Sequence, residues 1–178
     1  MARRRRAVAP VAGEGDHVER LRAAWARELP TVETLGMAIV GRARRITLAL
    51  RPEIEAVFGR HGLDAGEFDV LATLRRAGEP YRLRPTALYS ALMVSSAGMA
   101  DRLARLAAAG LVRRERDPDD GRSLLVELTP RGRDVVEAAF QEDMAVEQRV
   151  VELLSPEEAG QLAALLAKLA RAIERREP

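Results

Sequence analysis

Residues 85–132 constrain the fold of this chain most, because two short helices and a hairpin follow one another there without a long connection. The segments RPTALYSALMV and SSAGMADRLARLAAAGLV each predict a helix, the first beginning near Pro85 and the second capped by Ser95 or Ser96. A break of three or four residues separates them. Two helices joined by so short a turn are typical of a helix-turn-helix.

A β-hairpin is predicted directly after the second of these helices. Strand candidates cover residues 111–116 and 123–129, and the polar sequence DPDDGR forms the turn between them. We expect Asp120 and Arg122 to pair and stiffen the turn, so that the arginine projects where a narrow minor groove would receive it. A turn that only meets solvent is the alternative. A hairpin that follows a helix-turn-helix makes a winged helix.

Apolar residues at helical spacing predict further helices before this region. They cover residues 17–29 and 31–50, and Pro52 either kinks the second helix or starts a new turn that runs to Phe58. Asp64 then caps a helix that leads towards the helix-turn-helix.

The last third of the chain predicts two more helices. Thr129-Pro130 is an N-cap followed by proline at the first helical position, and this helix runs to about Leu154. The sequence SPEE at residues 155–158 is a capping box that opens a final helix. Helices from both ends of the chain are too apolar to stand alone, which favours their use as a dimer interface.

We therefore expect a mainly α chain with a small β-hairpin wing, in which a winged helix-turn-helix domain is joined to an N- and C-terminal helical dimerisation region. The predicted divisions are a disordered basic arm at 1–16, N-terminal helices at 17–60, the winged helix-turn-helix at 61–129 and C-terminal dimerisation helices at 130–178. The sequence has no run of 18 uncharged apolar residues and no apolar signal segment after MARRRR, so a cytoplasmic protein without a membrane span is expected.

The composition excludes several classes of function. The sequence has no cysteine, which rules out disulfides, thiol redox sensing and cysteine-ligated zinc. It has no glycine-rich phosphate loop and only two histidines, so we expect no enzyme, no cofactor and no metal; Glu14 and Asp16 beside His17 would make a poor metal site. A sequence-nonspecific architectural DNA-binding protein is a further alternative, but the formal net charge of only +2 argues against it.

The second helix of the helix-turn-helix has two distinct faces on a helical wheel. Its buried face is predicted to contain Met99, Leu103, Leu106 and Gly110. The opposite face should enter the major groove of DNA, and it contains Ala97, Asp101, Ala104 and Ala108, with Arg105 beside them.

Contacts with DNA are expected from the start and from the open face of this helix. Ser95 and Ser96, together with the helix N-terminus, are placed to meet phosphate. The small side chain of Ala97 allows close approach to the bases. Arg105 is the best donor to a base or a phosphate, although Asp101, four residues earlier, can hold it in a surface ion pair.

Arg102 does not fit the groove-facing side of the helix. It lies about 60° from the direction of Met99, beside the buried face. A charge in that position must be paired or must face a cavity. We therefore expect the Arg102 side chain to point inward, towards the segment that covers the back of the helix.

Together these segments resemble the MarR family of winged-helix transcription regulators. The matching parts are the helix that ends in GLV, the Asp-x-Arg of the wing and the LTPRG that leads into the next helix, and the resemblance covers roughly residues 31–175. It implies a homodimer that binds a pseudo-palindromic operator in double-stranded DNA, usually as a repressor that a small ligand releases.

The chain resembles one branch of that family in particular, the urate-responsive regulators, which have an additional N-terminal helix. The resemblance implies a ligand site whose matching positions here are Trp25, Asp69, Arg102 and Arg114. In the implied mechanism an anionic, planar ligand binds the two arginines, competes with Asp69 for one of them and moves the helix that carries Arg102.

Each of these matches has a simpler reading. Trp25 continues an apolar helix face, and Asp69 lies opposite Phe68, so periodicity alone puts it in solvent. Arg113 can substitute for Arg114. The effector is also open, because trans-aconitate-like tricarboxylates or phenolic carboxylates would satisfy the same two arginines.

Overall fold

The computed structural model describes residues 15–92, 96–117 and 124–175. Ser95, Asp120, Arg122 and nearly all of the predicted basic arm therefore lie outside the described residues. The chain divides into two compact units, Met1–Arg51 and Pro52–Pro178. Within the described ranges, no helix has both the length and the apolar character needed to cross a membrane.

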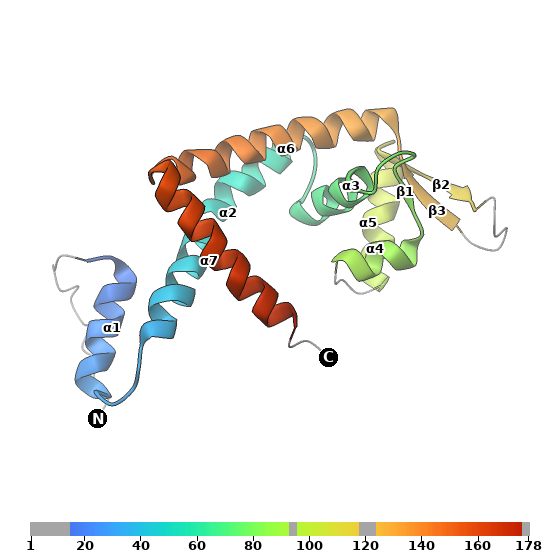
Figure 1. Cartoon of the computed structure of the whole chain (residues 1–178). Helices are drawn as coiled ribbons and strands as arrows, with labels where there is room; N and C mark the ends of the chain where they lie inside the picture. Colours follow the sequence, from blue (N-terminus) through green and yellow to red (C-terminus); the bar gives the residue numbers. More distant parts are fainter. Residues whose placement is uncertain (1–14, 93–95, 118–123, 176–178) are drawn as a thin grey trace, which may run out of the picture. The chain divides into compact units, whose positions relative to one another are not determined.

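The first unit contains α1 (His17–Glu28) and a π-helical turn (Met37–Gly41) that continues into α2 (Arg42–Arg60), as Figure 1 shows. The Asp16 side chain caps α1 by accepting a hydrogen bond from the backbone N–H of Glu19 at 2.8 Å. Val18 is the buried residue of α1, and its methyl groups lie beside Gly41. Apolar burial therefore contributes little to holding α1 in place.

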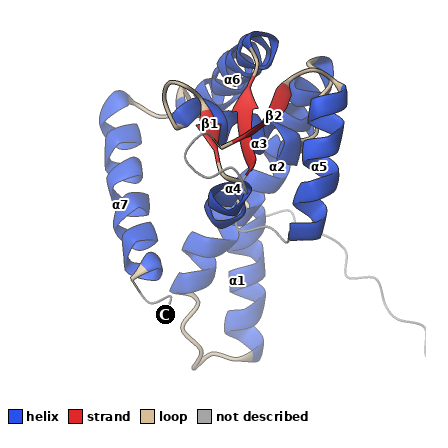
Figure 2. Ribbon diagram, turned by 90° about the vertical axis from the view of Figure 1, so that its right-hand side faces the viewer, coloured by secondary structure: helices blue, strands red, loops and turns tan. Residues whose placement is uncertain are grey.

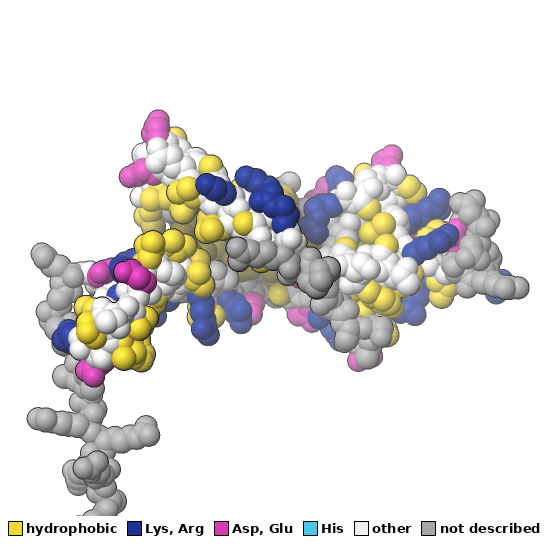
Figure 3. Space-filling model, turned by 60° about the horizontal axis from the view of Figure 1, so that its bottom comes forward, with side chains coloured by type: hydrophobic (Ala, Val, Ile, Leu, Met, Phe, Trp, Pro, Cys, Tyr) yellow, Lys and Arg dark blue, Asp and Glu magenta, His cyan; other side chains and the backbone are white. Residues whose placement is uncertain are grey.

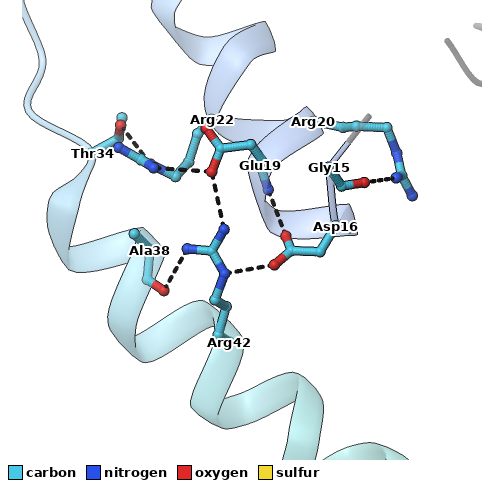
Figure 4. A network of polar contacts seen from close by, with 8 residues as sticks. All are labelled: Gly15, Asp16, Glu19, Arg20, Arg22, Thr34, Ala38 and Arg42. Atoms are coloured by element: carbon cyan, nitrogen blue, oxygen red, sulfur yellow. Dashed lines mark hydrogen bonds and ion pairs between the residues drawn. The ribbon is translucent and has the colours of Figure 1, made fainter. Parts of the chain in front are cut away.

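Charged side chains join α1 to the turn that precedes α2 (Figure 4). The Arg42 guanidinium donates to Asp16 Oδ2 at 2.6 Å, to Glu19 Oε2 at 3.0 Å and to the Ala38 carbonyl oxygen at 3.0 Å. The hydrogen bond from Arg42 lowers the pKa of the Asp16 carboxyl group. Because these groups are largely exposed, the network orients α1 more than it stabilises the fold.

Pro52 lies inside α2, which continues without a break to Arg60. The helix therefore extends beyond the predicted bound near Leu50, as the alternative with Pro52 inside the helix allowed, and the alternative of a separate turn that starts at Pro52 is wrong. Proline removes one backbone N–H from the helical ladder, but the following turns bury Val57 and Phe58, and that burial favours continuing the helix.

Three helices that precede the wing in the second unit match the predicted helix-turn-helix and the helix before it (Figure 2). They are α3 (Ala65–Arg76), α4 (Pro85–Leu92) and α5 (Ser96–Ala108). A capping box starts α3: the Asp64 side chain accepts from the Glu67 backbone N–H, and the Glu67 side chain accepts from the Asp64 backbone N–H. Residues 93–95 separate α4 from α5.

The wing is a three-stranded antiparallel sheet in the order β1-β3-β2. The predicted hairpin consists of β2 (Val112–Arg116) and β3 (Leu124–Leu128), with Arg114 opposite Val126. The sequence analysis did not predict β1 (Arg82–Leu83), which pairs with the edge of β3 that faces away from β2. Two residues are too few to show the alternation that reveals a strand.

The core of the second unit lies between α3, the helix-turn-helix and the inner strand β3. The rings of Phe58 and Phe68 stack with centroids 4.2 Å apart. Each large side chain that becomes fully buried contributes about 1.5–3 kcal/mol to folding. The fully buried side chains include Leu71, Leu74, Leu88, Met99, Leu103, Leu106, Val126 and Val136.

Gly110 corrects one detail of the helical wheel. The wheel put it on the buried face, but α5 ends at Ala108, and Gly110 is exposed with a φ of 70°. Glycine adopts this left-handed conformation at little cost, and a left-handed residue stops a helix.

The predicted N-caps of the two C-terminal helices are both confirmed. The Thr129 side chain accepts from the backbone N–H of Gly132 at 3.0 Å to start α6 (Pro130–Val151), and Ser155 forms a capping box with Glu158 to start α7 (Pro156–Glu174). α6 packs against α3, whereas α7 buries none of its residues. Figure 3 shows apolar side chains gathered on the surface of one face of the molecule, and those of α7 that are exposed are Leu162, Leu165, Leu166, Leu169 and Ile173.

Gly132, in the first turn of α6, lies too close to the backbone of Leu111 to be replaced by a larger residue. A Cβ added at Gly132 would overlap the backbone carbonyl oxygen of Leu111, which cannot move without moving the start of the wing. We predict that Gly132→Ala lowers the free energy of unfolding by about 2 kcal/mol or more. Gly160→Ala is the matched control in α7, because a Cβ there meets open space. Urea unfolding at fixed protein concentration compares them, and equal stability would contradict this packing.

Asp143 is a buried carboxyl group on the inner face of α6. It is 7% exposed, and its Oδ1 atom has no hydrogen-bond partner among the described residues. Burial, together with the nearby charge of Glu147, raises the pKa of Asp143. A carboxyl group whose pKa is higher in the folded state than in the unfolded chain lowers stability as the pH rises through the interval between the two values.

The neutral, isosteric change Asp143→Asn should therefore raise the free energy of unfolding at pH 7 by about 1 kcal/mol. The gain should disappear below the unfolded pKa of about 4, because the wild-type carboxyl group is then neutral in both states. Urea unfolding at pH 7 and at about pH 3.5 measures the difference. A gain of the same size at both pH values would show that the buried charge is not its cause.

Candidate nucleic-acid interface and ligand pocket

The two faces of α5 lie as the helical wheel predicts. Met99, Leu103 and Leu106 are buried, and Asp101, Ala104 and Ala108 on the other side are exposed. Ser96 and Ala97 form the first turn of α5, and the proposed phosphate contact Ser95 precedes it, outside the described residues. Ala104 and Ala108 give the described part of this face small side chains, which suits close approach to a groove of DNA.

Arg105 reaches from α5 to the first turn of α3. Its Nε donates to Glu67 Oε1 at 2.7 Å, and its Nη2 donates to Asp64 Oδ2 at 3.1 Å. The hydrogen bond to Glu67 is the main reason why the pKa of Arg105 is raised. The sequence suggested Asp101 as the ion-pair partner, and this is wrong, because α3 presents two carboxylates on the side to which Arg105 turns.

Arg102 turns away from the exposed face of α5, as predicted, and it is half-buried. Its guanidinium lies against Gly66, where an added Cβ would overlap the Cζ, Nη2 and Nε atoms. The Nε atom is buried and has no hydrogen-bond partner among the described residues. A buried donor left without a partner costs free energy, so the Nε–H group of Arg102 is available to donate a hydrogen bond to an acceptor atom of a ligand.

The Arg102 guanidinium borders a pocket of about 480 Å³, here named the Arg102 pocket. The other residues that line it come from α2, from the loop before α3 and from the first turn of α3. They are Glu55, Leu63, Asp64, Ala65 and Gly66. The sequence analysis did not assign these residues to a ligand site, although a glycine in the first turn of a predicted helix is a known sign of close packing.

The other three predicted ligand residues do not line the Arg102 pocket. Asp69 is exposed on α3, and Arg114 is exposed on β2. Trp25 belongs to the other unit, where it is 50% exposed and lines a separate, mainly apolar hollow of about 330 Å³ together with Leu29 and Met37.

Arg113, the alternative to Arg114, is engaged on the opposite face of the hairpin. It donates to Glu127 Oε1 at 2.8 Å and pairs with Glu115 Oε1 at 2.9 Å. Successive side chains of a strand alternate between faces, so Arg113 and Arg114 cannot serve the same site. Arg114 therefore remains the better candidate for a ligand contact at the base of the wing.

The wing is also tied to the start of the helix-turn-helix. Arg84, just before α4, donates to Asp117 Oδ2 at 2.9 Å, and Asp117 is 5% exposed. The predicted contact pair Asp120 and Arg122 lies outside the described residues. Among the residues that the structure describes, no group of three or more His, Cys, Asp or Glu side chains could hold a metal ion.

Known proteins share this arrangement. A family model described as MarR family matches residues 61–123. The HTH-type transcriptional regulator PecS of Dickeya dadantii (strain 3937) is 34% identical over 145 residues, which cover 82% of this chain and 87% of the relative.

Solved structures agree. Sco5413, a MarR family transcriptional regulator from Streptomyces coelicolor, is 27% identical with a TM-score of 0.66, covering 82% of this chain and 100% of that chain. AbsC, a MarR family transcriptional regulator from the same organism, is 24% identical with a TM-score of 0.69, covering 82% and 98%, and this likeness bears on the fold alone.

The geometry and the relatives lead to the same conclusion. A helix with a small, exposed face follows a short turn, a three-stranded wing follows that helix, and a relative that shares a third of its residues matches most of both chains. The chain belongs to the MarR family and is a DNA-binding transcriptional regulator of the winged helix-turn-helix type.

Proposed function

We propose that this regulator is a homodimer that represses from a pseudo-palindromic operator and is released when a small organic anion, such as urate, enters the Arg102 pocket. One observation carries the proposal: an arginine of the DNA-reading helix turns inward to a pocket, with a buried nitrogen that has no partner among the described residues. Guanidinium groups bind oxyanions and carbonyl oxygens through well-directed hydrogen bonds.

The lining of the pocket bears on the kind of ligand. Besides Arg102, the pocket presents the carboxylates of Glu55 and Asp64. Carboxylates accept hydrogen bonds and repel other carboxylates, so they favour a ligand that has N–H donors as well as acceptor oxygens. Urate has both, whereas a tricarboxylate offers acceptors alone. This supports urate over the tricarboxylate, whereas a phenolic carboxylate, which has one hydroxyl donor, remains the alternative effector.

The coupling to DNA follows from the place of Arg102 in the helix. Arg102 adjoins the exposed Asp101 and lies two residues from Ala104 on the same rigid helix. A ligand that draws the guanidinium off Gly66 also shifts these groove-facing residues. Allosteric couplings of this kind usually amount to about 1–3 kcal/mol, or roughly 5- to 150-fold in affinity.

Further contacts in the proposal are those that the sequence predicts. For the ligand the family resemblance implies Trp25, Asp69 and Arg114, which would have to approach the Arg102 pocket when it is filled. For DNA the helical wheel and the hairpin turn predict Ser95 and Ser96 at a phosphate, Ala97 and Asp101 in the major groove, and Asp120 and Arg122 of the wing in the minor groove.

The proposed homodimer is supported by α7. Its leucines and isoleucine lie on one face at helical spacing, and each of them is 45% to 62% exposed. An apolar face of this kind is stable in water only when another apolar surface covers it. A second copy of the chain offers the same face, and a symmetric dimer fits a two-fold symmetric operator.

We predict that urate weakens operator binding by at least about fivefold at fixed salt and changes the emission of Trp25, the single tryptophan. Arg102→Gln should abolish most of the release. Gly66→Ala should do the same while keeping the arginine, because its Cβ takes the place of the guanidinium, whose flexible end can move. Gly59→Ala is the matched control, since a Cβ there meets open space, and it should respond as the wild type does.

Fluorescence anisotropy of a labelled operator with excess unrelated DNA measures this release. If the protein keeps the operator and the emission of Trp25 does not change at saturating urate, urate is not the effector. The same assay with trans-aconitate and with a phenolic carboxylate tests the alternative ligands. Equal binding of operator and unrelated DNA would instead favour the architectural role.

We also predict that Leu169→Asp converts a dimer into a monomer at micromolar concentration, because it puts a charge into the covered apolar face. Ala164→Asp, on the opposite face of α7, should leave the dimer intact. Light scattering after gel filtration measures the mass of each variant. A wild-type protein that elutes as a monomer, or a dimer that tolerates Leu169→Asp, would contradict the proposed interface.

A further inference from the structure

The first turn of α3 contacts α5 through two arginines that lie three residues apart. Arg102 rests on Gly66, and Arg105 binds the side chains on either side of it, Asp64 and Glu67. We name Arg105, Asp64 and Glu67 the Arg105 ion-pair cluster. Residues three apart in a helix project from nearly the same side, so both arginines face α3 rather than the groove.

Glu67 is the buried member of the cluster. Its side chain is 10% exposed, and both of its oxygen atoms are engaged: Oε2 accepts from the Asp64 backbone N–H at 3.0 Å, and Oε1 accepts from Arg105 Nε at 2.7 Å. A buried carboxylate is stable only when a positive charge and hydrogen bonds replace its water. Arg105 supplies that charge, so removing it leaves Glu67 buried and uncompensated.

Asp64 takes part in three interactions at the start of α3. Its Oδ1 caps α3 by accepting from the Glu67 backbone N–H at 2.7 Å, its Oδ2 accepts from Arg105 at 3.1 Å, and it lines the Arg102 pocket. The residue that caps α3 therefore also binds α5 through Arg105. Any shift of α5 along α3 must stretch these bonds, which fixes the position of α5.

The same bonds make Arg105 a poor DNA contact. Glu67 and Asp64 occupy the Nε–Nη2 edge of the guanidinium, which is one of the edges that binds phosphate or guanine through two parallel N–H groups, and their two negative charges offset its positive charge. To bind DNA through the Nε–Nη2 edge, Arg105 would have to release both carboxylates. The exposed face of α5 would then gain a cation while Glu67 lost its partner.

We propose that Arg105 is a positioning residue that fixes the DNA-reading helix on the capping box of α3, and that it does not contact the operator. This inference rests on the operator binding proposed above. It replaces the sequence-based assignment of Arg105 to a base or a phosphate. It also makes Glu67, which sequence reasoning did not single out, a determinant of DNA affinity.

A double-mutant cycle of Arg105→Gln, Glu67→Gln and the double variant tests the proposal. Glutamine at residue 67 keeps the capping hydrogen bond and removes the charge alone. Glu137→Gln is the matched control, because Glu137 accepts from Arg75 at the same 2.7 Å in an ion pair between α3 and α6. Operator affinity is measured over a range of salt concentrations, and urea unfolding without DNA is measured in parallel.

A positioning role predicts that each single variant weakens operator binding by about two- to fivefold, which is the usual contribution of one ion pair. The double variant should bind the operator no more weakly than either single variant. The salt dependence should stay that of the wild type, and Glu137→Gln should bind as the wild type does. A role in stability alone would change urea unfolding without changing the operator affinity of the folded protein, and that result overturns the proposal.

A DNA contact predicts the opposite behaviour of the two single variants. Arg105→Gln would then bind much more weakly, with the salt slope reduced by about one, and Glu67→Gln would bind as tightly as the wild type or more tightly. That pattern overturns the proposal. Failure of the wild type to prefer operator over unrelated DNA counts against the operator binding itself, whereas the unfolding cycle still measures whether Glu67 and Arg105 are coupled.

Discussion

The contact between α5 and the first turn of α3 is the constraint on which the rest of the molecule depends. Four consecutive residues, 64–67, cap α3, hold Arg105 and leave room for Arg102. The apolar side of α5 fills the core, while its two arginines, Arg102 and Arg105, contact α3. The position of the DNA-reading face is therefore set by a small polar joint as well as by the core.

This joint also explains how one helix can serve two purposes. Arg105 resists movement of α5 because it satisfies a buried carboxylate, whereas the Nε of Arg102 has no hydrogen-bond partner within residues 15–92, 96–117 and 124–175 that would oppose movement. The two groups lie about one turn apart on the same helix, so in the proposed mechanism a ligand at Arg102 would act close to the fixed point and would tilt α5 about it. A displacement of this kind moves groove-facing side chains without unfolding the core.

Much of the fold could be predicted from the sequence, because caps and periodicity are local signals. Thr129, Ser155 and Asp64 start their helices where expected, and Met99, Leu103 and Leu106 are buried as the wheel requires. The two-residue β1 and the continuation of α2 through Pro52 depend on tertiary contacts that leave no local pattern. The inward turn of Arg102 followed from its place on the helix. The partners of Arg105 did not, because they lie about 40 residues earlier in the chain.

Reciprocity between ligand and DNA tests the central claim most directly. If the Arg102 pocket and the operator bias the same two positions of α5, each must weaken the binding of the other by the same factor. Titration calorimetry of urate, with and without saturating operator, measures the ligand side of this linkage. The account predicts that the operator lowers urate affinity by the factor by which urate lowers operator affinity, at least about fivefold. Equal urate affinity with and without operator would contradict it.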